Sequence, residues 1–105
     1  MSVEHTISNG GRRHVFKAPT RKSFEQFKYE MTVELDRKWV HFMATYHWHG
    51  HTVYVRNPGA VGFVRFLDGI VHVELNLESW PATLPWVTPM IIRDLKTMTE
   101  GLAGR

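Results

Sequence analysis

Three histidines at alternate positions, His47, His49 and His51, form the part of this sequence that most resembles a metal site. Imidazoles with this spacing on a strand can converge on zinc, copper or nickel. The His49-Gly50 pair, however, also predicts a turn, which would leave His47 and His51 on different faces of a hairpin. Because the chain has no cysteine and no nearby carboxylate completes a ligand set, we interpret the three as solvated turn histidines. We expect no metal and no cofactor.

The other polar side chains of the same region do not indicate catalysis. A hydrolase needs a nucleophile beside a base, and the chain contains no cysteine nucleophile. Thr45 and Tyr54 supply the only hydroxyls expected near His41, His47 and His72, and both are ordinary strand residues. The sequence therefore predicts a protein that is not an enzyme.

The segment from Trp80 to Pro89 combines two tryptophans, one leucine and three prolines. Proline prevents a long regular helix, and tryptophan is enriched where a protein meets an apolar phase or a partner. Trp80, Leu84 and Trp86 are therefore our candidate binding residues. The alternative is that the tryptophans close the open end of the core.

Most of the expected structure lies between Val40 and Leu77. Four apolar-rich runs are separated there by three turn motifs, His49-Gly50, Asn57-Pro58-Gly59 and Asp68-Gly69. Asp-Gly between alternating runs strongly indicates a hairpin, since a type I′ turn needs positive φ at both central residues. The stretch predicts a four-stranded antiparallel meander.

Two helices are expected on either side of the meander. Phe24, Phe27, Met31 and Leu35 recur at helical spacing within the range 20–38, where Ser23 and Gln26 resemble a capping box. A second helix is expected from Thr88-Pro89 to about Thr99, with Gly101 as its stop.

The prediction is an α+β fold in a single domain over residues 12–105, after a mobile N-terminal arm over residues 1–11. A four-stranded antiparallel meander carries two helices packed on one face, in the order (β)-α-β-β-β-β-α. The bracketed strand is an optional edge strand near residues 12–17. A second optional strand, a short one, is expected at residues 5–8 of the arm.

Strand alternation divides the meander into a core face and an open face. The core predicted from it and from the two helices is Phe24, Phe27, Met31, Leu35, Phe42, Ala44, Val53, Val55, Val64, Phe66, Val71, Val73, Leu75, Ile91, Leu95 and Met98. The open face keeps an apolar set, which predicts a homo-oligomer formed through that face. The set is Met43, Tyr54, Phe63, Leu67 and Ile70.

A series of aromatic, glycine and valine positions in the strands carries a family resemblance: Tyr46-x-Trp48-x-Gly50-x-Thr52-Val53, Gly59-x-x-Gly62-x-Val64, Val71-x-Val73 and Leu77. Through these motifs, residues 20–102 resemble the polyhydroxyalkanoic acid system proteins. These are small bacterial proteins encoded beside polyhydroxyalkanoate synthesis genes. The resemblance implies an accessory protein at storage-polyester granules, in contact with the granule surface or a granule protein. The family has no established catalytic residues to carry over.

Two further functions stay open. The net charge of +3 is too small to indicate nucleic acid by itself, but the first third is basic, which keeps a small nucleic-acid-binding module open. The basic residues are Arg12, Arg13, Lys17, Arg21, Lys22 and Lys28, and the alternative is that they belong to a solvated edge and helix face. The order of helix, strands and helix is also similar to that of double-stranded RNA-binding domains, although the second helix begins without lysine. Space between helices and sheet would instead suit a carrier of a hydrophobic small molecule. With no transmembrane segment in the sequence, the expected location is the cytoplasm, including the granule surface.

Overall fold

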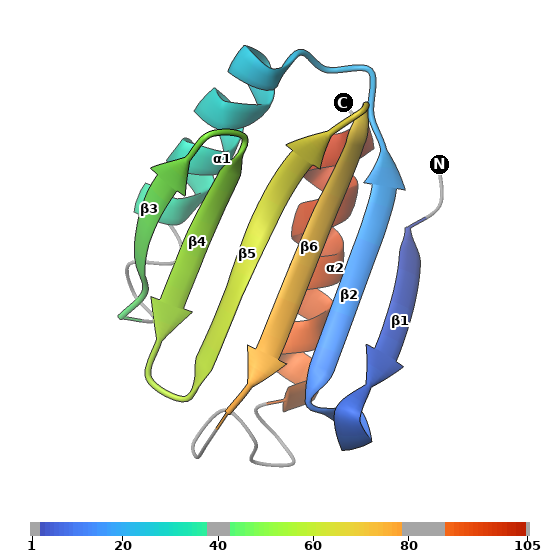
Figure 1. Cartoon of the computed structure of the whole chain (residues 1–105), viewed down its shortest axis with the longest axis vertical. Helices are drawn as coiled ribbons and strands as arrows, with labels where there is room; N and C mark the ends of the chain where they lie inside the picture. The colour runs from blue at the N-terminus through green and yellow to red at the C-terminus, as the bar shows by residue number, and fades with distance from the viewer. Residues whose placement is uncertain (1–2, 38–42, 79–87, 105) are drawn as a thin grey trace.

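A six-stranded antiparallel sheet with two helices on one face makes up the part of the chain that the computed structural model describes, residues 3–37, 43–78 and 88–104 (Figure 1). The elements follow in the order β1 (Glu4–Ser8), the 3-10 turn η1 (Asn9–Gly11), β2 (Arg13–Pro19), α1 (Phe24–Arg37), β3 (Thr45–His49), β4 (Thr52–Asn57), β5 (Ala60–Leu67), β6 (Ile70–Leu77) and α2 (Thr88–Gly104). The mixed fold and the meander β3 to β6 confirm the prediction. The sheet, however, has two more strands than the meander alone.

The strand order β1-β2-β6-β5-β4-β3 places the N-terminal hairpin beside the last strand of the meander. β2 was predicted as an optional edge strand, but it pairs with both β1 and β6 and is interior. β2 is buried on both faces, as expected for an interior strand. Phe16 and Ala18 are buried on the face that the helices cover, and Val15 is buried on the other face. Residues 4–8 of the predicted arm form β1, so the arm belongs to the sheet.

Both helices begin close to their predicted positions. The backbone N–H of Gln26 donates to Ser23 Oγ over 3.2 Å, which confirms Ser23 as the cap of α1. α2 starts at Thr88 but does not stop at Gly101 and continues to Gly104. Leu102 and Ala103 are buried beyond that glycine, so tertiary packing outweighs its weak helix propensity.

The turns of the meander fix its register. Asp68 and Gly69 both have positive φ, and Leu67 pairs with Ile70 as predicted. At the first turn His49 pairs with Thr52, so the central residues are Gly50 and His51 instead of His49 and Gly50. Gly50 has φ of 60° there, a conformation that favours glycine. This one-residue change shifts each β3–β4 pair by two positions and therefore leaves every side chain on its predicted face.

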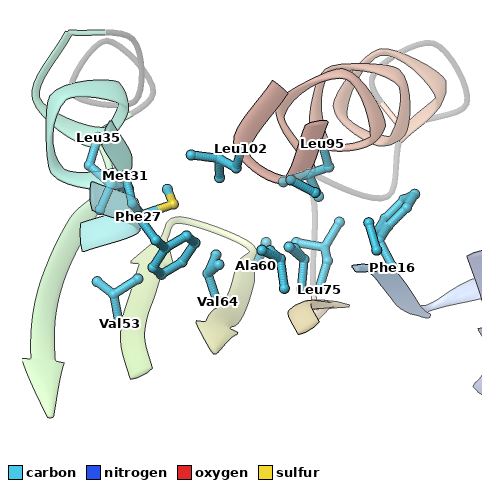
Figure 2. Close-up of a cluster of buried hydrophobic side chains, with 14 of the residues drawn as sticks. Phe16, Phe27, Met31, Leu35, Val53, Ala60, Val64, Leu75, Leu95 and Leu102 are labelled. Carbon is cyan, nitrogen blue, oxygen red and sulfur yellow. The ribbon is translucent and has the colours of Figure 1, made fainter. Parts of the chain in front are cut away.

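The core lies between the sheet and the two helices (Figure 2). Nine predicted core residues are buried, namely Phe27, Met31, Leu35, Val53, Val64, Val71, Val73, Leu75 and Leu95. Phe24, Val55, Phe66, Ile91 and Met98 are partly buried against them. Ala44 is half-buried outside this cluster, and Phe42 lies outside the described residues. The core also includes residues that the predicted core list lacks: Phe16, Ala18, Ala60, Leu77, Leu102 and Ala103.

A pair of histidines holds the edge strand β1 against β2. His14 Nε2 lies 2.9 Å from the carbonyl oxygen of Gly11, so this nitrogen carries the proton and donates it. His14 Nδ1 is then the acceptor for His5 Nε2, 3.0 Å away. The His5 ring also stacks on Phe16, with centroids 4.2 Å apart.

This histidine pair predicts a loss of stability in mild acid. Burial lowers the pKa of His5 below 6.5, and the nearby His14 and Lys96 lower it further. The unfolded chain therefore takes up a proton more readily than the folded one, so stability is complete above about pH 6.5 and falls as the pH drops towards the lowered pKa.

Thermal melting between about pH 7.5 and pH 5.5 measures this effect. We expect the melting temperature to fall towards pH 5.5 in the wild type and to fall less in His5→Asn. The control is His49→Asn, which removes an exposed histidine of β3. An equal acid response in wild type and His5→Asn would contradict the role given to His5.

Candidate nucleic-acid interface on the open sheet face

Four rings cross the face of the sheet that the helices leave open, one from each strand of the meander. His47 pairs with Tyr54, and Tyr54 pairs with Phe63. The ring centroids are 5.3 Å apart for His47 and Tyr54, 6.2 Å for Tyr54 and Phe63, and 5.6 Å for Phe63 and His72. These four residues are called the aromatic row below. Such a row is possible because strand alternation and the register bring all four to one face.

Cationic side chains lie on both sides of the aromatic row. The Arg65 guanidinium carbon is 4.8 Å from the centroid of the Phe63 ring, and its Nε donates to Thr52 Oγ1 over 3.1 Å. His72 stands between Arg65 and Lys17 on adjacent strands, and Arg56 pairs with Thr45 and Val61. Lys17, Arg56 and Arg65, called the cationic set below, form no ion pair with any described residue.

Two acidic residues lie on this face: Glu4 of β1, which is opposite Lys17, and Glu74 of β6, which is neutralised by Arg13. Arg13 donates to Glu74 over 2.8 Å, and this hydrogen bond holds the pKa of Glu74 below its usual value. The pKa of His72 is lowered by burial and then by Lys17 and Arg65. The cations Arg13, Lys17, Arg56 and Arg65 outnumber the carboxylates Glu4 and Glu74, so the open face carries an excess of positive charge around the aromatic row.

A hollow of about 380 Å³ lies at the β3–β5 end of this face. Its lining includes His47, Tyr54, Arg56 and Val61. Tyr54 is 37% exposed. The hollow thus joins two rings of the aromatic row to a cation of the cationic set.

The apolar set predicted as a self-association interface is divided by charge. Tyr54 and Phe63 pair with each other, and Leu67 pairs with Ile70 at the turn between β5 and β6. Arg65, His72 and Lys17 pair across β5, β6 and β2, and they lie between the Tyr54–Phe63 pair and the Leu67–Ile70 pair. Met43 precedes β3, has φ of 59° and is exposed. Self-association through this face stays a prediction, and it would have to cover these cations.

The three candidate metal ligands do not come together. His47 stacks on Tyr54 on the open face, whereas the His51 ring lies 3.9 Å from that of Phe24 on the helix side. His49 is exposed at the end of β3. Within the ranges that the structure describes, no group of three His, Cys, Asp or Glu could hold a metal ion.

The basic residues of the first third do not form one patch. Lys22 is buried and contacts Glu30 and the carbonyl oxygen of Gly101, which links α1 to α2. Arg12 donates to the carbonyl oxygen of Glu78, and Lys28 lies 5.3 Å from the ring centroid of Trp48. Lys17 is the member of this group that contributes an unpaired charge to the open face.

Trp80, Leu84 and Trp86 lie outside the described residues. The granule contact predicted for them, and the storage-polyester function behind it, stay predictions. Among the described residues, no helix is long and apolar enough to cross a membrane.

The fold and the open face define the chain as an α+β domain with helices on one side of its sheet and a basic, aromatic surface on the other. Comparison with family models, with curated proteins and with solved structures finds no match for the chain. Its function is therefore argued from the surface itself.

Sequence reasoning placed the rings of the aromatic row on the open face. It assigned Tyr54 and Phe63 to an apolar interface and considered His47 as a metal ligand, so it did not recognise the four rings as one row. It missed the contribution of β2, which adds Lys17 beside His72. The alternation Arg13, Val15 and Lys17 was a detectable pattern, since it places two cations on the face opposite Phe16.

Proposed function

We propose that this protein is a non-catalytic module that binds single-stranded nucleic acid on its open sheet face. The observation that carries the proposal is the aromatic row, which crosses four strands with the cationic set on either side. Proteins that bind single strands without sequence preference combine stacking rings with a cationic surface that follows the phosphates.

The shape of the surface favours single strands over duplexes. A broad sheet face cannot enter the major groove of a duplex as a helix does, whereas unpaired bases can be spread over a sheet and stacked on its rings. The hollow beside His47 and Tyr54 offers space for such a base next to Arg56. Every base has a flat face, so this arrangement predicts little sequence preference.

The phosphates would be bound by Lys17, Arg56 and Arg65. Arg65 is already oriented by Thr52 and by its position over Phe63, so it loses little conformational freedom on binding. Each phosphate neutralised on a single strand contributes about −0.7 to the slope of log K against log salt. Three contacts therefore predict a slope of about −2.

The test is fluorescence anisotropy with a labelled oligothymidine of about 12 nucleotides, titrated at several salt concentrations. Tyr54→Ala is expected to weaken binding roughly 5- to 150-fold, the usual range for removing one stacked ring. Tyr54→Phe keeps the ring and should bind like the wild type. Arg56→Gln should reduce the salt slope by about 0.7.

Heparin and a duplex of the same sequence are the comparison ligands, because heparin carries charge without bases. Equal affinity for all three, together with no effect of Tyr54→Ala, would contradict stacking. Sedimentation of wild type and Phe63→Glu examines the alternative use of this face. A wild-type dimer that dissociates in Phe63→Glu and does not bind the oligonucleotide would assign the face to self-association instead.

A further inference from the structure

His72 belongs both to the aromatic row and to a line of cations that crosses the same face. The strand register places it opposite Arg65 of β5 on one side and opposite Lys17 of β2 on the other. Its ring stacks on Phe63, with centroids 5.6 Å apart and an angle of 26° between the ring planes. A titratable ring therefore stands between two members of the cationic set, beside the rings proposed to stack with bases.

The surroundings of His72 favour its neutral form in the free protein. Burial lowers the pKa of His72 below 6.5, and Lys17 and Arg65 lower it further. Glu74 on the same strand raises this pKa, but its carboxylate accepts a hydrogen bond from Arg13 over 2.8 Å, and Arg13 itself lowers the pKa. The free protein therefore carries an uncharged ring in the middle of its line of cations at neutral pH.

A bound nucleic acid would reverse this electrostatic balance. Phosphates held by Lys17 and Arg65 neutralise the two cations that oppose a charge on His72, and they bring negative charge to both sides of the ring. The Nε2 atom of His72 is buried without a hydrogen bond to any described residue, so a phosphate acts on the ring through its charge and not by contact with this nitrogen. Glu4 of β1 lies beyond Lys17, one strand further from the ring.

From the proposed function, on which this step rests, we infer that binding of single-stranded nucleic acid is coupled to proton uptake by His72, so that mild acid tightens the complex. At alkaline pH the ring is neutral in both states and contributes stacking alone. As the pH falls, the complex takes up the proton before the free protein does, and the affinity rises. The rise ends when the free protein is protonated as well.

The test is titration of the full chain with labelled oligothymidine at about pH 8 and about pH 6 and at constant ionic strength. Thymine does not titrate in this range, so a pH response comes from the protein. We expect the dissociation constant of the wild type to be lower at pH 6 by at least about threefold. His72→Phe keeps a ring against Phe63 but takes up no proton, so it should bind like the wild type at pH 8 and tighten less at pH 6.

His51→Asn is the matched control, because His51 is exposed and its ring lies on the helix side of the sheet against Phe24. This variant should keep the wild-type pH response. Circular dichroism at both pH values reports whether each variant is folded. NMR titration of the His72 ring in the wild type needs no variant, and it should show that added oligothymidine raises the pKa of His72.

The possible outcomes separate this inference from the function on which it rests. Equal tightening of wild type and His72→Phe in acid, or a His72 pKa that oligothymidine leaves unchanged, would overturn the role of His72 and leave nucleic-acid binding intact. No binding of oligothymidine at either pH would overturn the proposed function and this inference with it.

Discussion

Replacing Phe16 by alanine is expected to lower the free energy of unfolding by about 3–5 kcal/mol. The Phe16 side chain is 0% exposed and belongs to the main core, although it stands on a strand predicted as an optional edge. Its removal takes away buried apolar area and leaves a cavity under α2, which packs on β2. Urea unfolding followed by tryptophan fluorescence or circular dichroism gives the change directly.

Ile7→Ala is the matched control on the same hairpin. Ile7 is 56% exposed, so its truncation should change the free energy of unfolding by less than about 0.5 kcal/mol. Similar small values for Phe16→Ala and Ile7→Ala would mean that the N-terminal hairpin does not contribute to the core. The position of β2 between β1 and β6 would then be wrong.

Gly62→Ala is expected to destabilise the protein by about 1–3 kcal/mol or more, although it adds only one methyl group. The new Cβ atom would overlap the backbone carbonyl oxygen of Glu74, and a backbone atom cannot move aside like the end of a flexible side chain. The β5–β6 pairing would have to shift around Gly62 and Leu75, which pair with each other at the centre of the sheet.

Gly101→Ala is the opposite case within the same chain. A Cβ atom at Gly101 meets nothing within 4 Å, and the residue lies inside α2. Alanine should therefore raise the free energy of unfolding by about 0.5–1 kcal/mol, because glycine costs more backbone entropy in a helix. Thermal unfolding of both variants should give shifts of opposite sign. Two shifts of the same sign would contradict the local geometry at one of these glycines.

The meander was predictable because local patterns determine it. Asp68-Gly69 specified both the turn and the pairing of Leu67 with Ile70. Alternation with a period of two then assigned every described side chain of β3 to β6 to the correct face. The error at the first turn did not change the assignment of side chains to the two faces, because a shift of two positions preserves that alternation.

The N-terminal hairpin was harder to predict because its burial depends on distant residues. β1 is largely polar, and β2 mixes charged and apolar residues, a composition that equally fits a solvated edge. Phe16 and Ala18 are buried because β6 and α2 lie against them, and no local pattern shows that contact. For the same reason the helix beyond Gly101 was missed, since Leu102 and Ala103 are buried by tertiary packing.

For the candidate interface, the sequence located the rings but not their electrostatic surroundings. His47, Tyr54 and Phe63 were assigned to the open face from alternation alone. That Arg65 lies over Phe63, and that Lys17 joins this face, depends on rotamers and on the β2–β6 pairing. These two facts change the interpretation of the face from an apolar interface to a cationic, aromatic one.

The pairing of β2 with β6 also has a consequence for how the chain folds. A helix and three strands separate these two neighbours along the sequence, whereas the strands of the meander are joined by short turns. Closing long loops is slow, so we infer that the meander forms first and that the N-terminal hairpin docks late, after α2 is available. Phe16→Ala would then accelerate unfolding and leave the refolding rate nearly unchanged. During synthesis, β1 and β2 would leave the ribosome before the meander and yet pack after it.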